Sequence, residues 1–353
     1  MRIGLTLYGS LDEQSGGFRY DRKLVEGLEA AGDTVEVVTL PWKQYHRGLL
    51  DNGSRSLRRR LDVDVDVMIQ DELAHPSLVY TNRALPYPKV SVVHHLRASE
   101  PRRLAPLYRA VERRYLATVD AVVCNSHTTR GVVTDLGVDR AVVAPPAGDR
   151  FGPDIGGNRI DERAHAGPLR VVFVGNITPR KGLDTLVDGI AAADADIRLT
   201  VVGTPADTRH VAVVRTLVRE HGLTDRVSFA GRLDEDELDA TLEGSHVIAV
   251  PSRYEGFGIV YLEGMSYGLP ALATRAGGAR DIVTDGETGV LVDPDDPAAV
   301  ARELERFATD RDRVAAMGRA ARARYEAHPD WTETTARVRR LLADVAGTTE
   351  VPA

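Results

Sequence analysis

The sequence predicts an α/β protein built from two Rossmann-like domains, each with a doubly wound parallel sheet. Short apolar runs of β type alternate with helical patterns along most of the 353 residues, which is typical of parallel sheets covered by helices. The same plan begins twice, at Arg2 and again at Leu169. A chain of this length also forms two domains more often than one.

The first half begins with a strand at Arg2–Tyr8, which is followed by the glycine-containing loop GSLDEQSGGF and a helix to about Ala31. A second strand is expected at Thr34–Thr39. Later strands are predicted at Asp66–Gln70 (DVMIQ), Lys89–His94 (KVSVVH), Ala121–Cys124 (AVVC) and Ala141–Ala144 (AVVA). Each of these runs is short and rich in β-branched residues, as strands of a buried sheet are.

The second half repeats this order from Leu169, with the strand LRVVFVG, the loop NITPRK and the helix GLDTLVDGIAAA. Further strands are expected at RLTVVG, RVSFAG, HVIAVP and PALAT. The segment 152–168 is polar and rich in glycine and proline, which is typical of a linker. We therefore expect domains at 1–151 and 169–328, with a terminal helix within 329–353.

Composition limits the class of protein. The formal net charge of −7 argues against a nucleic-acid partner, which would require a basic surface. The single cysteine, Cys124, lies in an apolar run and is expected to be a small buried residue in a reducing compartment. No leader sequence and no membrane-spanning run is expected, because the chain starts directly with a strand and lacks a run of about 18 apolar residues. These features predict a cytoplasmic protein.

The most informative segment is VPSRYEGFGIVYLEGMSYGLPALAT, from Val250 to Thr274. It is predicted to pass from a buried strand through a glycine-containing loop into a helix that begins near Ile259. The start of a helix offers unpaired N–H groups to phosphate, and Gly256 and Gly258 allow a ligand to approach the backbone. Glu255 and Glu263 are suited to accept hydrogen bonds from sugar hydroxyls. This combination favours a sugar nucleotide as the ligand.

The same segment resembles the acidic signature of family-4-type retaining glycosyltransferases. The match includes the preceding PS, the EGFG core, the helix and the following GLP. It is strong from about Leu169 to Asp293 and generic over the first half. The resemblance implies the GT-B fold, in which two Rossmann-like domains face each other across a cleft. It also implies that the N-terminal domain serves the acceptor, that the C-terminal domain serves the donor, and that the terminal helix packs back on the N-terminal domain.

The resemblance implies roles for residues in the second half. Arg180 and Lys181 would bind the donor diphosphate, since fixed positive charge stabilises this leaving group. Glu255 would contact the donor sugar, and Glu263 would hold the ribose hydroxyls. The remaining residues expected at the donor are Gly175, Asn176, Gly256, Phe257 and Gly258. At Asn176 the chain departs from the family, which often has arginine directly after the glycine.

In the first half, the resemblance places a histidine at a strand end near the donor sugar. His94 is the better candidate, because His95 would point the other way if the strand continued. A lone histidine is more often structural than functional. Gly16 and Gly17, in the first loop between strand and helix, would let a ligand approach the backbone, although a simple turn explains them nearly as well.

A retaining enzyme of this family is thought to react on one face of the sugar, so that a diphosphate oxygen accepts the proton of the acceptor and no carboxylate base is required. The run LDVDVDV contains Asp62, Asp64 and Asp66, which superficially resemble a metal-binding Asp-x-Asp. We interpret it as a solvated approach to a strand. Activity without a metal ion or any cofactor is therefore expected, with the sugar nucleotide as co-substrate.

The acceptor is less well defined by the sequence. A carbohydrate, a glycolipid or a small molecule with a hydroxyl group would suit the family. The loops Trp42–Asn52 and Gln70–Asn82 are expected to select it. The segment Leu96–Ala117 is rich in arginine and could attract an anionic lipid or a phosphorylated acceptor, although an exposed helix face is slightly favoured. Peripheral contact with the inner face of a membrane therefore stays open.

Two other classes of function compete with this interpretation. An NAD-dependent oxidoreductase could share the Rossmann-like halves, but neither first loop contains G-x-G-x-x-G. A binding protein could keep the sugar-nucleotide site and lack transfer activity. The presence of His94, Arg180, Lys181, Glu255 and Glu263 together argues against that alternative.

Overall fold

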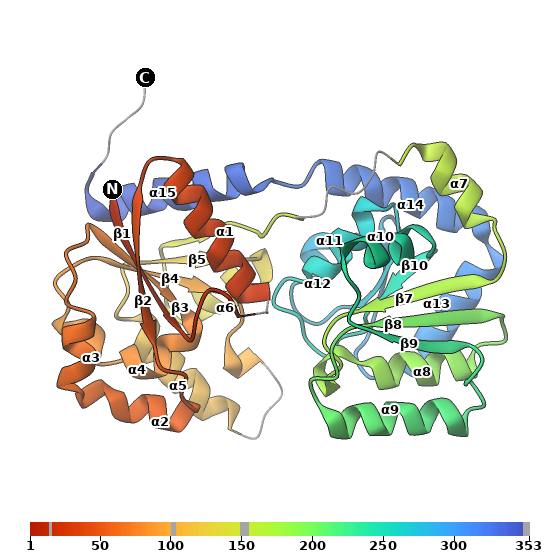
Figure 1. Cartoon of the computed structure of the whole chain (residues 1–353), viewed down its shortest axis with the longest axis horizontal. Helices are drawn as coiled ribbons and strands as arrows, with labels where there is room; N and C mark the ends of the chain where they lie inside the picture. Colours follow the sequence, from red (N-terminus) through yellow and green to blue (C-terminus); the bar gives the residue numbers. More distant parts are fainter. Residues whose placement is uncertain (14–15, 100–103, 149–154, 349–353) are drawn as a thin grey trace. The chain divides into compact units, whose positions relative to one another are not determined.

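The computed structural model describes residues 1–13, 16–99, 104–148 and 155–348 (Figure 1). The chain divides into two compact units. The first unit comprises Met1–Ala147 together with Pro329–Ala353, and the second comprises Gly148–His328. The first unit is therefore discontinuous in sequence.

The first unit is built on a parallel sheet of six described strands in the order β2-β1-β3-β4-β5-β6. These strands are β1 (Arg2–Tyr8), β2 (Thr34–Leu40), β3 (Val67–Asp71), β4 (Lys89–Val93), β5 (Ala121–Cys124) and β6 (Ala141–Val143). β1 has β2 on one side and β3 on the other, so that the strand order reverses beside it. In parallel sheets, ligands bind beyond the carboxyl ends of the strands at such a switch point.

Helices cover both faces of this sheet, and short 3₁₀ turns lie among them. The helices are α1 (Gly16–Ala30), α2 (Tyr45–Leu50), α3 (Arg55–Arg60), α4 (His75–Leu78), α5 (Ala105–Leu116), α6 (His127–Asp135) and α15 (Trp331–Ala346). The 3₁₀ turns are η1 (Asp51–Gly53), η2 (Glu72–Ala74), η3 (Thr81–Ala84) and η4 (Arg97–Ser99). Residues 100–103, within the predicted arginine-rich helix, lie outside the described residues.

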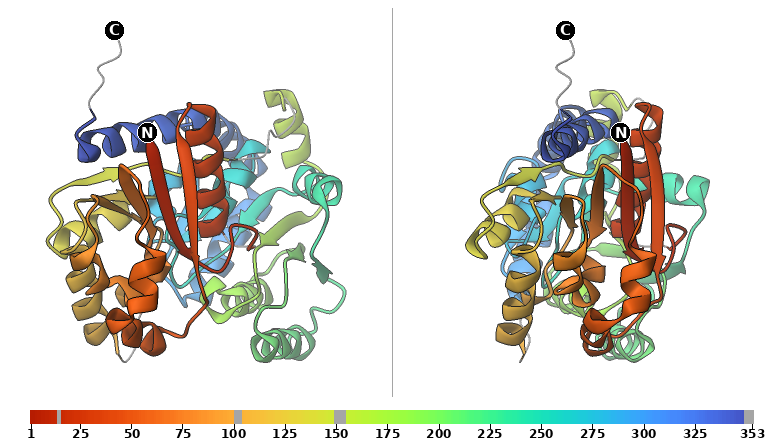
Figure 2. Two further views of the ribbon diagram at one scale, coloured as in Figure 1. Left: turned by 60° about the vertical axis from the view of Figure 1, so that its left-hand side comes forward. Right: turned by 90° about the vertical axis from the view of Figure 1, so that its left-hand side faces the viewer.

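α15 packs alongside α1 (Figures 1 and 2), although some 300 residues separate the two helices in sequence. Its N-terminus is fixed by a capping box at Asp330. Val338 and Leu342 are fully buried in the core that α1 shares with the sheet. Arg339 donates to the carboxylate of Asp33 at 2.7 Å. This C-terminal helix is thus part of the core of the first unit.

The second unit contains a parallel sheet of six described strands in the order β12-β11-β10-β7-β8-β9. These strands are β7 (Leu169–Val174), β8 (Ile197–Val202), β9 (Val227–Gly231), β10 (Val247–Ala249), β11 (Ala271–Thr274) and β12 (Gly289–Val292). The order is that of the Rossmann fold, and its switch point lies between β7 and β10. The prediction of two doubly wound parallel sheets is confirmed.

The helices of the second unit are α7 (Gly157–Ala164), α8 (Leu183–Ala192), α9 (Thr208–Glu220), α10 (Glu235–Glu243), α11 (Ile259–Ser266), α12 (Ala279–Ile282), α13 (Pro297–Thr309) and α14 (Arg311–Glu326), with a 3₁₀ turn η5 (Pro179–Lys181). Much of the linker expected at 152–168 is therefore not a linker. Ile160 and Ala164, four residues apart on α7, are buried in the core of the second unit. This apolar stripe outweighs the polar composition of the segment.

Several side chains clarify the sequence patterns. Cys124 is buried, and burial raises the pKa of its thiol to about 12, as expected of a residue that packs rather than reacts. Asp64 and Asp66 form ion pairs with Arg2, so this run joins the approach to β3 to the start of β1.

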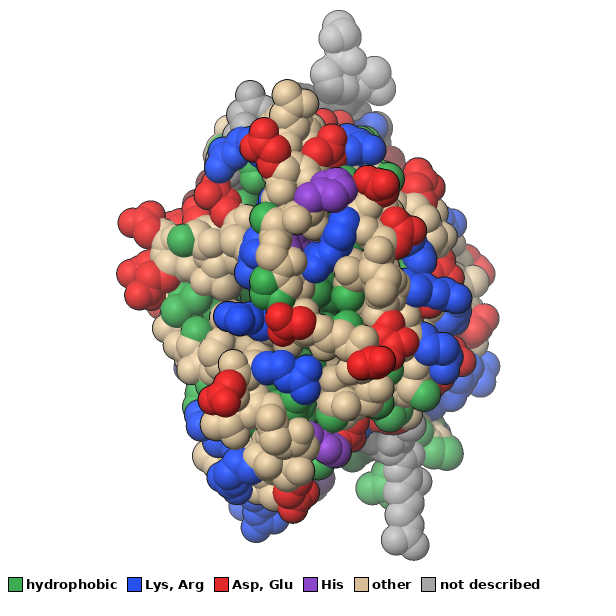
Figure 3. Space-filling model, turned by 90° about the vertical axis from the view of Figure 1, so that its right-hand side faces the viewer, with side chains coloured by type: hydrophobic (Ala, Val, Ile, Leu, Met, Phe, Trp, Pro, Cys, Tyr) green, Lys and Arg blue, Asp and Glu red, His purple; other side chains and the backbone are tan. Residues whose placement is uncertain are grey.

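On the face of the molecule in Figure 3, acidic and basic side chains are interspersed.

Candidate donor and acceptor sites

In the second unit, the structure brings together three residues that the sequence analysis selected. Arg180 and Lys181 belong to η5, after β7, whereas Glu255 lies in the loop after β10. Lys181 Nζ lies 2.5 Å from one Glu255 oxygen, and Arg180 contacts the other at 3.2 Å. The two segments that flank the switch point thus place two cations around one carboxylate.

Glu255 is ionised at neutral pH. Its side chain is only 8% exposed, and burial alone would raise its pKa. Lys181 and Arg180 outweigh this effect and lower the pKa of Glu255 to about 2. Ser252 adds a hydrogen bond of 2.8 Å from its hydroxyl. The carboxylate therefore can accept hydrogen bonds but cannot serve as a general acid near pH 7.

The EGFG loop owes its shape to glycines. Gly258, the N-cap of α11, has φ of 92°, in the left-handed region that favours glycine. The loop pairs with the segment after β11, where the backbone N–H of Gly278 donates to the carbonyl of Glu255 at 2.7 Å. A Cβ atom at Gly278 would collide with the carbonyl oxygen of Gly256. This support was not predicted from the sequence, although the GG pair in TRAGGARD is a signal for it.

The other predicted donor residues lie on the same two segments or on α11. Gly175 directly follows β7, and Asn176 beside it is exposed. Phe257 is 6% exposed and packs into the core, with its ring 5.9 Å from that of His328. Glu263 is half-buried on α11.

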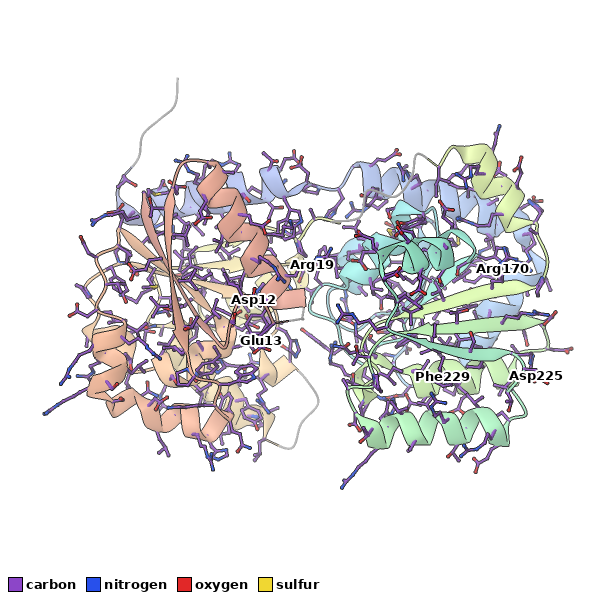
Figure 4. All side chains as sticks on the ribbon, viewed as in Figure 1. Asp12, Glu13, Arg19, Arg170, Asp225 and Phe229 are labelled. Carbon is purple, nitrogen blue, oxygen red and sulfur yellow. The ribbon has the colours of Figure 1, made fainter. Side chains whose placement is uncertain are left out.

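Arg253, which the sequence analysis did not select, also holds this region together. It donates its backbone N–H to the carbonyl of Arg180 at 2.8 Å and pairs with Asp184 at 2.8 Å and Asp295 at 2.7 Å. These donor-side residues follow the carboxyl ends of strands. Arg170 and Asp225 lie at the opposite side of the sheet, near the amino-terminal ends of strands (Figure 4).

In the first unit, His94 lies immediately after β4 and is surrounded by carboxyl groups. Its Nε2 is 3.4 Å from Asp21 on α1 and 3.8 Å from Asp71 at the end of β3. Glu72, the next residue, accepts the backbone N–H of His94 at 3.0 Å. A Cβ atom at Gly17 would lie 3.2 Å from the His94 ring, so Gly17 leaves room for that ring.

The other predicted glycine, Gly16, begins α1 and has open space where a side chain would lie. In this part of the first unit, Asp12 and Glu13 precede α1 and Arg19 lies in its first turn (Figure 4).

The pKa values of these three carboxyl groups are all raised. Burial raises the pKa of Asp21 to about 7, although a hydrogen bond with Asp71 acts in the other direction. Burial, the neighbouring charge of Asp21 and their hydrogen bond raise the pKa of Asp71 well above its ordinary value. Burial and then Asp71 raise that of Glu72 to about 8. A hydrogen bond between Asp21 and Asp71 requires a proton on one of them.

Among the described residues, Asp21, Asp71 and His94 are the group with the spacing of metal ligands, because one ligand atom from each lies within 4.8 Å of the others. A cation here would compete with the protonation that the raised pKa values of Asp21 and Asp71 favour. Asp62, Asp64 and Asp66 do not form such a group within the described part of the chain. The contacts place His94 between the two buried carboxyls of Asp21 and Asp71.

His94 was predicted from the sequence, whereas the carboxyls around it were not. Asp71 and Glu72 directly follow the apolar run VMI, and the order DE at a strand end was an available signal. Asp21 lies in the amphipathic pattern of α1, where it could not be distinguished from a solvated residue. Its burial follows only from the tertiary structure.

Comparison with known families agrees with this architecture. Residues 158–324 match the family described as Glycosyl transferases group 1, and residues 15–149 match Glycosyltransferase Family 4. Together the two matches cover most of the chain. The chain belongs to glycosyltransferase family 4. The family resemblance inferred from the EGFG segment is thereby confirmed.

Curated relatives of this family-4 chain include a D-inositol 3-phosphate glycosyltransferase from Salinispora tropica. It is 34% identical over 263 residues, which are 67% of this chain and 52% of the relative. A GDP-mannose-dependent alpha-(1-6)-phosphatidylinositol monomannoside mannosyltransferase from Mycobacterium tuberculosis is 32% identical over 256 residues, or 68% of this chain and 66% of the relative. The matched region thus spans between about half and two thirds of these relatives.

Solved structures share the fold. A sucrose-phosphate synthase from Thermosynechococcus elongatus superposes with a TM-score of 0.83 at 21% identity, covering 99% of this chain and 100% of that chain. Anabaena HepE in complex with UDP and glucose gives a TM-score of 0.77 at 18% identity, covering 98% and 100%. The chain therefore has the GT-B fold. In the described part of the family-4 chain, no helix is both long and apolar enough to cross a bilayer.

Proposed function

We propose that this family-4 chain is a retaining glycosyltransferase. It moves a sugar from a nucleoside-diphosphate sugar, with UDP or GDP as the nucleotide, to a hydroxyl group of an acceptor. The observation that carries the proposal is the pair of cations, Arg180 and Lys181, around the ionised Glu255 at the switch point of the second sheet. Family membership favours this activity over that of an NAD-dependent oxidoreductase.

The charges at this site suit the departing diphosphate. Two cations and one carboxylate leave a surplus of one positive charge, in a setting where the Lys181 side chain is only 13% exposed. A partly desolvated cation stabilises developing negative charge more than it would in water. Glu255 remains ionised and accepts hydrogen bonds from donor sugar hydroxyls, and Glu263 holds the ribose.

The proposed reaction proceeds on one face of the sugar. The bond between C1 and the diphosphate oxygen breaks, and the acceptor oxygen bonds to C1 from the same side. The proton of the acceptor hydroxyl passes to the departing diphosphate oxygen. Arg180 and Lys181 take the place that a divalent ion has in metal-dependent enzymes, so we propose that transfer needs no metal. His94 would orient the donor sugar, through a ring held by Asp21 and Asp71.

The relatives support two choices to test first. One is named for GDP-mannose and phosphatidylinositol monomannoside, and another for D-inositol 3-phosphate. A mannosyl donor and a cyclitol phosphate acceptor are therefore the first pair to try, in solution and on a membrane surface. α5 offers a surface for peripheral contact, because it exposes Leu107 and, further along the helix, Arg113 and Arg114.

The proposal is tested by calorimetric titration of the full chain with UDP, GDP, ADP and NAD in EDTA. We expect one nucleoside diphosphate to bind without metal and NAD not to bind. Lys181→Met is expected to weaken that binding at least tenfold, because a charge-assisted contact to phosphate is lost. Glu263→Ala is expected to weaken it several-fold through the ribose. Lys23→Met, at an exposed ion pair on α1, is the matched control and should bind as the wild type.

Retention is checked separately by NMR of the anomeric proton in the product. An inverted product would refute the proposed stereochemistry. Binding of NAD alone, or transfer that EDTA abolishes and Mg²⁺ restores, would refute the proposed donor site.

A further inference from the structure

A pocket of about 450 Å³ opens in the first unit beyond the carboxyl ends of its strands. Its lining includes four aromatic and two basic side chains, which are Tyr8, Trp42, Tyr45, Tyr108, Lys43 and Arg97. The volume is within the range of small-molecule sites in proteins. Aromatic faces combined with a few charged groups are typical of a pocket that binds a ring with polar substituents.

Trp42 forms an exposed wall of this pocket. Its side chain is 57% exposed, which is unusual for a residue of this size. Edge contacts hold it in place, with ring centroids 5.6 Å from Tyr8 and 6.3 Å from Phe18. The fold therefore fixes a large apolar surface without covering it, which is typical of a binding surface.

Arg97 brings positive charge to the pocket. Its guanidinium lies over Tyr45 at 5.2 Å and over Tyr108 at 5.0 Å. The Nε atom of that guanidinium is buried and has no hydrogen-bond partner among the described residues. Glu112 is near enough to interact electrostatically, but its carboxyl accepts backbone N–H groups of Arg97 and Ala98 instead.

Lys43, the second cation of the pocket, differs from Arg97 because it forms an ion pair. Lys43 Nζ lies 2.6 Å from both carboxylate oxygens of Asp51, so its charge is compensated within the fold. The guanidinium of Arg97 therefore keeps donors for a ligand. Its planar fork of donors matches the geometry of phosphate.

The pocket lies next to the His94 site. Leu73, on its wall, directly follows Glu72, whose carboxyl binds the backbone N–H of His94. Arg97 lies three residues after His94. A ligand in the pocket would therefore lie beside the histidine at the end of β4.

We infer that this pocket is the acceptor site and that it takes a hydroxylated ring carrying a phosphate group. The ring packs against Trp42, and the phosphate binds Arg97. The inference rests on the proposed glycosyl transfer and specifies its acceptor, which the arginine-rich segment and the Trp42–Asn52 loop left open. It assigns acceptor recognition to residues outside the EGFG signature.

Trp42 itself provides the measurement. The chain has two tryptophans, Trp42 and Trp331, so the Trp331→Phe variant reports fluorescence from the pocket alone. The probes are inorganic phosphate and hexose and cyclitol phosphates, each ring compound paired with its unphosphorylated form. We expect at least one phosphorylated ring to change Trp42 emission at concentrations at which its unphosphorylated partner does not.

Arg97→Gln in the Trp331→Phe background is expected to weaken that binding about tenfold or more, as loss of a charge-assisted contact should. Binding of the unphosphorylated partner should change less than about twofold. The matched control is Arg83→Gln, since Arg83 also lies over a tyrosine, Tyr80, at 5.6 Å but away from the pocket. This control should leave the titration unchanged.

The phosphate could belong to a soluble compound or to a lipid headgroup. Vesicles of phosphatidylcholine with and without phosphatidylinositol distinguish these sources in the same assay. Binding to either source that depends on Arg97 supports the inference. Phosphorylated and unphosphorylated probes that bind equally, an unaffected Arg97→Gln variant, or no response of Trp42 to any probe would overturn it.

The nucleotide titrations separate this inference from the proposed function. Normal nucleotide binding without a response of Trp42 would refute the acceptor pocket and leave the donor site standing. Failure of nucleotide binding would instead refute the proposed function.

Discussion

Glu255 in the second unit and Asp21 in the first are both buried carboxyls near the switch point of a parallel sheet, yet their pKa values move in opposite directions. That of Glu255 falls to about 2, whereas that of Asp21 rises to about 7. Burial acts the same way on both. The difference is that Lys181 and Arg180 outweigh the effect of burial at Glu255, whereas the hydrogen bond with Asp71 does not outweigh it at Asp21.

This contrast shows how one type of fold can provide two kinds of site. The cations after β7 keep Glu255 ionised and leave a surplus of positive charge, which suits a diphosphate. Buried acids on α1 and at the end of β3 have raised pKa values and hold a histidine. The sheets are alike, and the residues in the loops determine the electrostatics.

The largest expected effect is an opposite response of the two units to pH. Asp21 binds more protons folded than unfolded between about pH 4 and 7, so its stabilising contribution is complete below pH 4 and is lost as pH rises through 7. The change is at most about 4 kcal/mol at 1.36 kcal/mol per unit. Glu255 binds fewer protons folded, so its contribution is present above about pH 4.5 and is lost as pH falls towards 2.

Denaturant unfolding followed by tryptophan fluorescence measures this in the first unit, because Trp42 and Trp331 both belong to it. The free energy of unfolding of the wild type should fall between pH 5 and 8, and that of the Asp21→Asn variant should fall less. The exposed Asp12→Asn is the control. Parallel curves for wild type and Asp21→Asn would mean that Asp21 is ionised throughout.

Removing a cation from the second unit tests the other side of the contrast. Lys181→Met leaves Glu255 buried with Arg180 and is expected to destabilise the chain by about 3 kcal/mol, as breaking a buried pair does. Glu255→Gln in the same chain should recover part of this loss, because the uncompensated charge is then absent. Calorimetric unfolding of the two single variants and the double variant gives the coupling. Additive effects would show that the pair does not interact.

Replacement of His94 tests whether the buried acids serve the reaction. His94→Asn is expected to lower kcat about 10- to 100-fold, which corresponds to about 1.4–2.7 kcal/mol in the barrier. The same substitution at His95 should have a smaller effect, because the contacts with Asp21 and Asp71 belong to His94. Equal losses in the two variants would remove the distinction between these histidines.

The smallest effect is expected at the aspartates before β3. Asp64→Asn removes an exposed partner of Arg2, and such surface pairs contribute little to stability. Neither the unfolding midpoint nor the transfer rate in EDTA should change measurably. A loss of activity in this variant that excess Mg²⁺ reverses would identify the run as a metal site after all.

The sequence predicted the candidate site of the second unit better than that of the first. Five of the six described strands of the second unit, the EGFG loop and the convergence of the segments after β7 and β10 follow from sequence patterns, whereas β12 (Gly289–Val292) was not predicted. The approach of Lys181 to Glu255 did not follow, because residues 74 positions apart meet only through strand order. The roles of these residues at the donor remain predictions.

In the first unit, the strands were predicted to within a residue or two, but the acidic cluster and the pocket were not. Asp21 lies on a helix and Asp71 at a strand end, and no local pattern shows that they share a hydrogen bond. The walls of the pocket come from several separated segments. The helix α7 was missed for a different reason, since glycine and proline around it obscured a short apolar stripe.

The position of α15 has a consequence for synthesis. A ribosome releases the N-terminal strands first, but Val338 and Leu342, which complete the core around α1, emerge only after the whole second unit. The nascent first unit therefore exposes the apolar surface that α15 will cover while the second unit already has all its strands. We therefore expect the second unit to form stable structure before the first, the reverse of their order along the chain.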